Sequence, residues 1–324
     1  MNLRLLVLLT LSLLWSNVQA ADLPGISQFI DEMVVKFQFK KDDLVQVFKQ
    51  VEYRPDVIAA ITAPATIKPW QEYRASFLNP PRIDGGSAFW NQYAAVLQRA
   101  EEQYGVPQEI IVAVIGVETL YGRRAGRYRT LDALTTLAFD YPHRADFFRN
   151  ELAEYLLLAR EQNFNLLEIK SSYAGALGIP QFMPSSYRKY AVDFNANGKI
   201  DILNEPEDAI GSVANYLKIY GWKTGEPIAQ LAAINSGYSV PAIKDSRSLA
   251  AWLEIGVAPV NKPQTATPPA WLIDFTVDSG KEYWLTYNNF RVITQYNNSN
   301  FYAMTVLQLA EILRASHTSA SASH

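Results

Sequence analysis

The pattern of hydrophobic and polar positions predicts a mainly helical chain. Apolar residues recur at helical spacing in residues 29–37 and again in residues 44–51. We expect further helices over residues 89–104, 131–139, 208–220 and 301–313, and another that ends near residue 162. Residues 271–302 instead alternate apolar and polar side chains, which predicts a small sheet. A Pro- and aromatic-rich connector, residues 64–81, is too apolar for a loose linker and is expected to wrap the core.

The most apolar predicted helix ends at a carboxylate. Pro107 suits the first turn of this helix, and Gly122 suits the stop at its end. No charge lies between Glu109 and Glu118. A helix that is apolar nearly all round belongs in the centre of a fold. Glu118 is therefore expected to lie on apolar ground near the C-terminal end of a central helix.

Two interpretations of Glu118 follow from this position. The carboxylate could be the structural partner of Arg123 or Arg124, which come shortly after it. Alternatively, burial and the negative end of the helix dipole raise its pKa, so that it still carries a proton near neutral pH and acts as a catalytic acid. This stretch alone leaves both interpretations open.

Composition and the first residues narrow the class of protein. The chain has 324 residues, of which 49% are hydrophobic and 19% charged, with a formal charge of -3 and no cysteine. These values are typical of a soluble globular protein with a sizeable core, and nothing in them favours a nucleic-acid partner. Arg4, an apolar run and a small-residue site ending at Ala20 predict a signal peptide over residues 1–20, and no later stretch is long enough to span a bilayer. Because there is no cysteine, we expect a periplasmic protein that is not a lipoprotein.

A second informative stretch, residues 171–187, is dense in small residues, Pro, Gln and aromatic residues and carries no charge before its end. Small residues let the backbone approach a ligand closely. Ser172 and Gln181 would then offer hydrogen bonds to an uncharged polar ligand. A tightly packed turn beneath the core would have the same composition, so composition does not decide between the two.

Residues 193–201 have the pattern of a calcium loop. Oxygen-bearing side chains stand at Asp193, Asn195 and Asn197, with Gly198 at the sixth position and the Lys199 carbonyl at the seventh. The twelfth position holds Asn204 where a Glu usually closes the loop. Glu205, Glu207 or Asp208 could close a longer loop. The alternative is a turn rich in Asn and Asp.

The chain has few residues for other kinds of catalysis. It has no phosphate-binding Gly loop and only three histidines, two of which, His317 and His324, lie near the C-terminus. His143 alone remains for base chemistry, so a Ser-His-Asp hydrolase is not expected. His143 and Arg144 could bind an anionic group, although solvation of a helix start is the more common role for such residues.

These stretches together resemble the family-3 lytic murein transglycosylases. The resemblance rests on residues 116–122 (GVETLYG), 174–187 (AGALGIPQFMPSSY), the loop that begins at Asp193, residues 208–216 (DAIGSVANY) and residues 296–302 (YNNSNFY). The motifs stand in the family's order and cover about residues 25–314. The resemblance implies a goose-type lysozyme-like helical core with a helical N-terminal region and a small β-containing domain.

The resemblance also implies an activity and a site. It implies cleavage of the MurNAc-β-1,4-GlcNAc bond of peptidoglycan to give 1,6-anhydro-MurNAc ends, with Glu118 as the single acid/base and glycan strands as the partner. It implies substrate contacts at Tyr73, Arg144, Ser172, Gln181, Tyr216, Tyr296, Asn297 and Tyr302. It implies Ca²⁺ as a structural ion, and no organic cofactor, with ligands at Asp193, Asn195, Asn197, Lys199 and Asp208.

The implied organisation has four parts. Residues 1–20 are the signal peptide and residues 21–104 the N-terminal helical region. Residues 105–314 form the catalytic core, which includes the EF-hand-like loop (193–208) and the β segment (271–302). Residues 315–324 are expected to be a disordered tail.

The chain departs from the family at several places, and other functions stay open. It lacks a lipidated cysteine, has His143 where two adjacent Arg are often seen, has Asn for Asp in the calcium loop, and has Tyr121 where some members have Trp. A muramidase would use water in place of the C6 hydroxyl of MurNAc. A non-catalytic peptidoglycan-binding scaffold is the alternative from another class of function.

Overall fold

The computed structural model describes residues 23–63, 68–239, 244–261 and 268–321, with side chains up to residue 318. The predicted signal peptide lies outside the described residues. Helices make up the first part of the chain: α1 (Ile26–Phe37), α2 (Lys41–Phe48), α3 (Pro55–Thr62), α4 (Trp70–Phe77), α5 (Pro80–Gln92), α6 (Ala94–Tyr104) and α7 (Gln108–Thr119).

Further helices follow in the remainder of the chain: α8 (Thr130–Asp140), the 3-10 helix η2 (Pro142–Arg144), α9 (Ala145–Gln162), α10 (Pro184–Tyr190), α11 (Pro206–Ile219), α12 (Leu249–Glu254), α13 (Asn288–Tyr296) and α14 (Asn300–Ser321). The strands are short: β1 (Tyr128–Arg129), β2 (Lys170–Ser171), β3 (Ala229–Ile234), β4 (Val257–Pro259), β5 (Trp271–Val277) and β6 (Gly280–Thr286). The prediction of a mainly helical protein is therefore confirmed.

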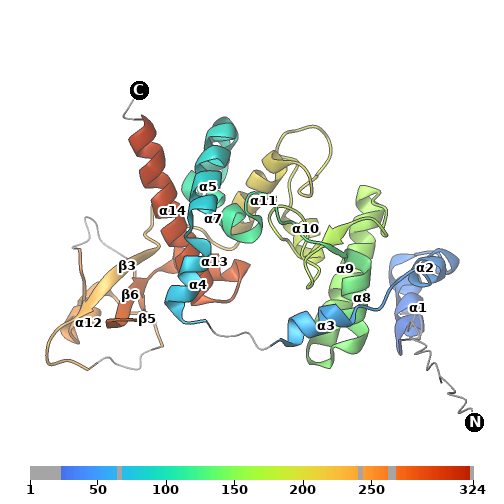
Figure 1. Ribbon diagram of the computed structural model, residues 1–324, viewed down its shortest axis with the longest axis horizontal. Coiled ribbons are helices and arrows are strands. Elements are labelled where there is room, and N and C mark those ends of the chain that lie inside the picture. Colours follow the sequence, from blue (N-terminus) through green and yellow to red (C-terminus); the bar gives the residue numbers. More distant parts are fainter. Residues whose placement is uncertain (1–22, 64–67, 240–243, 262–267, 322–324) are drawn as a thin grey trace, which may run out of the picture.

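Helix α7 is central, as its composition predicts. Ile111, Val112 and Val114 are fully buried. The helix packs against α14, α5, α11 and α6, and Figure 1 shows it in the middle of the molecule, with the sheet on one side and α8 and α9 on the other. Because α7 is surrounded by other helices, its last turn lies where elements from distant parts of the chain meet.

The sheet has the antiparallel order β4-β3-β6-β5 and lies at one end of the molecule (Figure 1). One of its faces forms a small core that includes Trp252, Leu285 and Tyr287. Phe275 on β5 points the other way and packs on Trp70 of α4, with ring centroids 4.6 Å apart. This ring pair joins the sheet to the helical part of the molecule.

The sheet differs from the prediction at both of its limits. Residues 288–302 were expected to be strand, but they form α13 and the start of α14. Phe290 and Ile293 are three residues apart and both buried, which is helical spacing within an apparently alternating pattern. The sheet also recruits β3 and β4, which lie before the predicted segment.

Two other segments contain helix that the sequence did not predict. The connector of residues 64–81 contains helix α4, whose Trp70 is buried. The tail was expected to be disordered from residue 315, but α14 continues to Ser321. Near its end, the ring of His317 stacks on Trp90, with centroids 4.4 Å apart. This aromatic contact supplies packing that the Ser- and Ala-rich composition did not indicate.

Candidate functional site

Glu118 lies in the last turn of α7, half-buried, and accepts a hydrogen bond from a tyrosine. The hydroxyl of Tyr302 on α14 donates to Oε1 of Glu118 over 2.6 Å. Burial raises the pKa of Glu118 to about 7, and the Tyr302 hydrogen bond partly opposes this rise. A carboxyl group with such a pKa is protonated in a large fraction of molecules at neutral pH, which suits a proton donor.

The structural interpretation of Glu118 finds no support among the described residues. None of the ion pairs there includes Glu118, and both Arg123 and Arg124 are exposed. The amide of Arg124 donates instead to the carbonyl of Thr119, within the turn that ends α7. The geometry thus favours the carboxyl with a raised pKa over the ion-paired carboxylate.

A group of tyrosines surrounds this carboxyl. The rings of Tyr302 and Tyr296 are stacked, with centroids 6.3 Å apart and planes 14° apart. The ring of Tyr216 lies 4.9 Å from that of Tyr296. Burial, and then the charge of Glu118, raises the pKa of Tyr73 and of Tyr296. Residues from α4, α7, α11, α13 and α14 therefore meet here, and we call Tyr73, Tyr216, Tyr296 and Tyr302 the tyrosine group.

Backbone carbonyls fix two of these rings. The hydroxyl of Tyr296 donates to the carbonyl of Pro180 over 2.6 Å. The hydroxyl of Tyr216 donates to the carbonyl of Gln295 over 2.7 Å. The stretch of residues 171–187 thus reaches the tyrosine group at Pro180, next to Gln181.

Gln181 is itself firmly held. Its backbone is left-handed, with φ 52°, and its side-chain amide donates to the carbonyls of Ala125 and Gly178. The Ser172 hydroxyl accepts the amide of Ala176 over 3.1 Å. Both side chains lie in tight turns, so the packed-turn interpretation is correct for their backbone.

Two predicted contact residues lie outside the tyrosine group. Arg144 is exposed at the start of α9, with its guanidinium 4.2 Å from the ring centroid of Phe147. Asn297 is exposed at the end of α13, directly after Tyr296. The structure gives neither side chain a contact with Glu118.

The candidate calcium loop is closed by a carboxylate. The amide groups of Asn195 and Asn197 both donate to the carboxylate of Glu205. The carboxylate of Asp193 accepts the backbone amides of Asn197 and Gly198. Of the three closing residues that the sequence offered, Glu205 is therefore the one that the Asn195 and Asn197 side chains contact.

Asp208, an expected calcium ligand, lies against the backbone of the loop. It is fully buried, and its two oxygens accept the backbone amides of Phe194, Asn195 and Asp201. Its role is to hold the loop backbone. No group of three or more His, Cys, Asp or Glu able to hold a metal occurs within the described part of the chain, so any cation here would also need the Asn oxygens.

Thr119 is a structural residue of the site that the sequence reading missed. It is fully buried, its hydroxyl donates to the carbonyl of Ile179, and it accepts the amide of Gly122. The sequence did contain a signal for this role, namely a hydroxyl-bearing residue where an apolar helix meets a turn. Through this side chain, the turn after Glu118 is tied to the stretch that carries Gln181.

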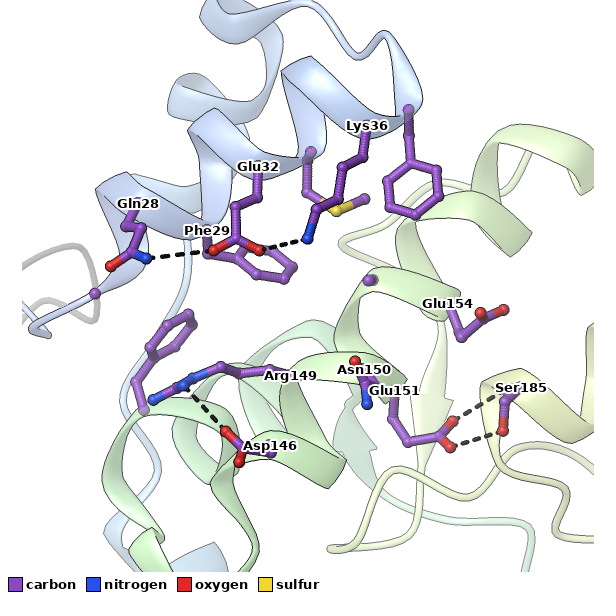
Figure 2. Close-up of a pocket in the computed structure, with 15 residues that line it drawn as sticks. Gln28, Phe29, Glu32, Lys36, Asp146, Arg149, Asn150, Glu151, Glu154 and Ser185 are labelled. Atoms are coloured by element: carbon purple, nitrogen blue, oxygen red, sulfur yellow. Dashed lines mark hydrogen bonds and ion pairs between the residues drawn. The ribbon is translucent and has the colours of Figure 1, made fainter.

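A separate cavity of about 580 Å³ lies between α1 and α9 (Figure 2). Ion pairs Lys36–Glu32 and Arg149–Asp146 stand on its two walls. Its buried carboxylate, Glu151, accepts two hydrogen bonds from Ser185, and Figure 2 shows it turned toward that residue. Ser185 thus donates to both oxygens of Glu151, whereas Tyr302 donates only to Oε1 of Glu118.

The chain matches one protein family over most of its length. Residues 22–311 match the family model described as a transglycosylase SLT domain. The chain is 42% identical over 301 residues to membrane-bound lytic murein transglycosylase B of Escherichia coli (strain K12), which covers 90% of this chain and 83% of that protein. Among the described residues, no helix has the length and apolar character needed to cross a membrane.

Solved structures of the same kind have the same fold. Soluble lytic transglycosylase SltB1 from Pseudomonas aeruginosa is 46% identical, with a TM-score of 0.85 over 91% of this chain and 100% of that one. Escherichia coli lytic transglycosylase Slt35 in complex with calcium is 41% identical, with a TM-score of 0.84 over 92% and 95%. SltB3 from Pseudomonas aeruginosa in complex with NAG-anhNAM-pentapeptide is 30% identical, with a TM-score of 0.81 over 89% and 78%.

Proposed function

Since the chain belongs to the transglycosylase SLT domain family and is a lytic transglycosylase of peptidoglycan, we propose that Glu118 is its single acid/base and that its product is a 1,6-anhydro-MurNAc end. The observation that carries this proposal is the half-buried Glu118 carboxyl, with a pKa of about 7 and a hydrogen bond from Tyr302. The complex of SltB3 with an anhydro sugar supports the product.

One carboxyl group is enough for this reaction. The Glu118 carboxyl gives its proton to the glycosidic oxygen as the bond from that oxygen to C1 of MurNAc breaks. The oxygen of the substrate's own 2-acetamido group stabilises C1. The Glu118 carboxylate then takes the proton of the C6 hydroxyl, and that oxygen bonds to C1. No water is consumed, and Glu118 ends protonated, ready for another cycle.

An ordinary glycosidase would need a second carboxylate on the other face of the sugar. In the described part of the chain, Glu118 is the carboxylate whose charge raises the pKa of Tyr73, Tyr296 and Tyr302. The substrate supplies its own nucleophile, the C6 hydroxyl, and its own acetamido group, so a second carboxylate is not needed.

The tyrosine group would form the floor on which sugar rings lie. The rings of this group surround the carboxyl, with Tyr73 and Tyr296 half-buried and Tyr216 and Tyr302 buried. Aromatic faces pack well on the apolar faces of sugars. In this proposal Ser172 holds the acetamido group, and Gln181 places Glu118 or the sugar. Asn297 and Arg144 would contact more distant parts of the substrate.

We also propose that the loop binds Ca²⁺. Asp193, Asn195, Asn197, the Lys199 carbonyl and Glu205 supply the oxygen atoms that this cation prefers. Rotation of the two Asn amides by half a turn would direct oxygen rather than nitrogen to the ion, since the two ends of an amide group are nearly the same in size and shape. The calcium complex of Slt35 supports this assignment. The ion would stiffen the loop that precedes α11, the helix of Tyr216.

The location in the cell follows from the same set of proposals. Residues 1–20 would direct export and be removed after Ala20, so that the mature chain works in the periplasm. Peptidoglycan strands would be the partner there.

Mass spectrometry of peptidoglycan digested by the mature protein tests the proposed reaction. We expect anhydro-muropeptides from the wild type, and at least about a thousand-fold fewer from Glu118→Gln, which cannot donate a proton. Reducing-end products would identify a muramidase instead. Glycan binding without any product from either protein would identify a scaffold.

A further inference from the structure

The turn that follows Glu118 is in an unfavourable backbone conformation. Leu120, Tyr121 and Gly122 all have left-handed backbones, with φ 51°, 62° and 85°. For a residue other than glycine this conformation costs about 1 kcal/mol or more. Contacts outside the turn must therefore hold it in place.

The ring of Tyr121 provides one such contact. The ring lies against Gly86 of α5 and Gly116 of α7. A Cβ atom at either position would clash with the Tyr121 hydroxyl. The hydroxyl donates to the carbonyl of Arg82 over 2.8 Å. The ring thus fills the gap where α5 and α7 approach each other.

Arg82 completes the arrangement from the other side. Its side chain is 8% exposed, and Nε donates to the carbonyl of Gly116 over 2.8 Å. Its Nη1 donates to the carbonyls of Ser76 and Phe77, each over 3.2 Å. One guanidinium therefore binds the last carbonyls of α4 and a carbonyl in the last turn of α7, where helix dipoles favour a cation.

These two helices carry two of the proposed substrate residues. Tyr73 is on α4, and Glu118 is two residues after Gly116 on α7. The fork of Arg82 sets the position of one helix end relative to the other, and Tyr121 fixes the backbone that leaves Glu118. A lysine has a single ammonium in place of this planar fork.

We propose that Arg82 is a positioning residue for Glu118, acting through the Gly116 carbonyl and the Tyr121 turn to keep the carboxyl at the Tyr302 hydroxyl. This inference rests on the proposed function of Glu118. It assigns Arg82 no contact with the substrate. Without the guanidinium, the last turn of α7 loses its tie to α4, and the hydrogen bond from Tyr302 to Glu118 lengthens or breaks.

The experiment compares Arg82→Met, Arg82→Lys and Tyr121→Phe with Tyr302→Phe. The hydrogen bond from Tyr302 lowers the pKa of Glu118. Removal of this hydrogen bond therefore moves the alkaline limb of the plot of kcat against pH, called the limb below, to higher pH. We expect Arg82→Met to move the limb in the same direction and to reduce kcat about ten- to a hundredfold, with KM nearly unchanged. Arg82→Lys and Tyr121→Phe should show smaller effects of the same sign.

The double variant Arg82→Met/Tyr302→Phe is the decisive comparison. If Arg82 acts through this hydrogen bond, the double variant should have the same limb as Tyr302→Phe alone, because coupled residues do not give additive effects. Val57→Ala is the control, since Val57 is fully buried on α3, a helix that packs on α8. It should lower the melting temperature and leave both kcat and the limb as in the wild type.

A purely structural Arg82 would behave like that control, with a lower melting temperature and no change of limb, and this result would overturn the proposal. If Arg82→Met does not fold, the same comparison is made with Arg82→Lys and Tyr121→Phe. Carbon-13 NMR titration of the Glu118 carboxyl gives its pKa without turnover. If Arg82→Met shifts the pKa of Glu118 and the wild type makes no anhydro product, the proposed function is refuted and the role of Arg82 still stands.

Discussion

At the residue scale, Glu118 combines a polar group with surroundings that disfavour its charge. The composition of residues 110–117 was enough to predict apolar surroundings, but it left open whether the carboxyl is ion-paired or has a raised pKa. The hydroxyl that meets the carboxyl was not predictable from local pattern, because Tyr302 is far away in the chain and comes close only when α14 packs on α7. Family resemblance supplied Tyr302 as a site residue, and geometry supplied its contact.

The raised pKa of Glu118 should make the protein less stable as pH rises. The folded protein holds this proton up to about pH 7, whereas the unfolded chain releases it near pH 4.5. Stability is therefore lost between these two values and not regained above them, by at most about 3 kcal/mol. Glu118→Gln has no proton to lose at this position, so it should be more stable than the wild type at pH 8.

Thermal melts of both proteins between pH 4 and pH 8 check this prediction. The difference in melting temperature should be small at pH 4 and grow as the pH approaches 7. A difference that does not change with pH would mean that the Glu118 carboxyl is ordinary in its proton affinity.

At the scale of elements, the calcium loop shows where spacing is reliable and where it is not. Asp193, Asn195 and Asn197 follow a fixed spacing, and the structure brings them together. The closing residue depends on how the chain leaves the loop, which spacing does not determine. Asp208 lies in the first turn of α11 and accepts amides of the loop backbone, while Glu205, just before the helix, accepts the Asn side-chain amides.

We expect Glu205→Gln to weaken Ca²⁺ binding. The loss of one of the two carboxylates in the proposed ligand set, Asp193 and Glu205, reduces the charge that attracts the ion. Wild-type protein should gain about 2.7 kcal/mol of stability at a calcium concentration one hundred times the Kd. The variant should gain clearly less at the same concentration, as measured by thermal melts with calcium and with chelator.

Glu207→Gln is the matched control, since it removes the same charge only two residues away, whereas the Asn195 and Asn197 amides donate to Glu205. It should respond to calcium as the wild type does. Equal responses of both variants and the wild type would show that Glu205 is not a ligand.

The whole molecule is held together by contacts between elements that are distant in sequence. The helices were largely predictable, because their apolar spacing is a local property. The length of the sheet, the helical character of residues 315–321 and the order of α4 were not, because each depends on a distant partner: β3 for the sheet, Trp90 for the tail and Phe275 for α4.

Phe275→Ala should separate the sheet from the helical part energetically. Phe275 is 1% exposed, and its ring packs on Trp70 and Phe301. Removal of a buried phenyl ring typically costs about 3–5 kcal/mol. Urea denaturation should show a loss of this size. Thr276→Ala, at the neighbouring exposed position of the same strand, should change stability by at most about 0.5 kcal/mol.

The packing of α14 on α7 also constrains how the protein is made. Helix α7 is apolar on all sides, and one of its main partners starts only at residue 300. While the chain is being synthesised or exported, the apolar surface of α7 lacks this partner until almost the last residues are available. We therefore expect α7 to fold late, because its packing depends on a partner distant in sequence, and we expect fragments that stop before α14 to aggregate.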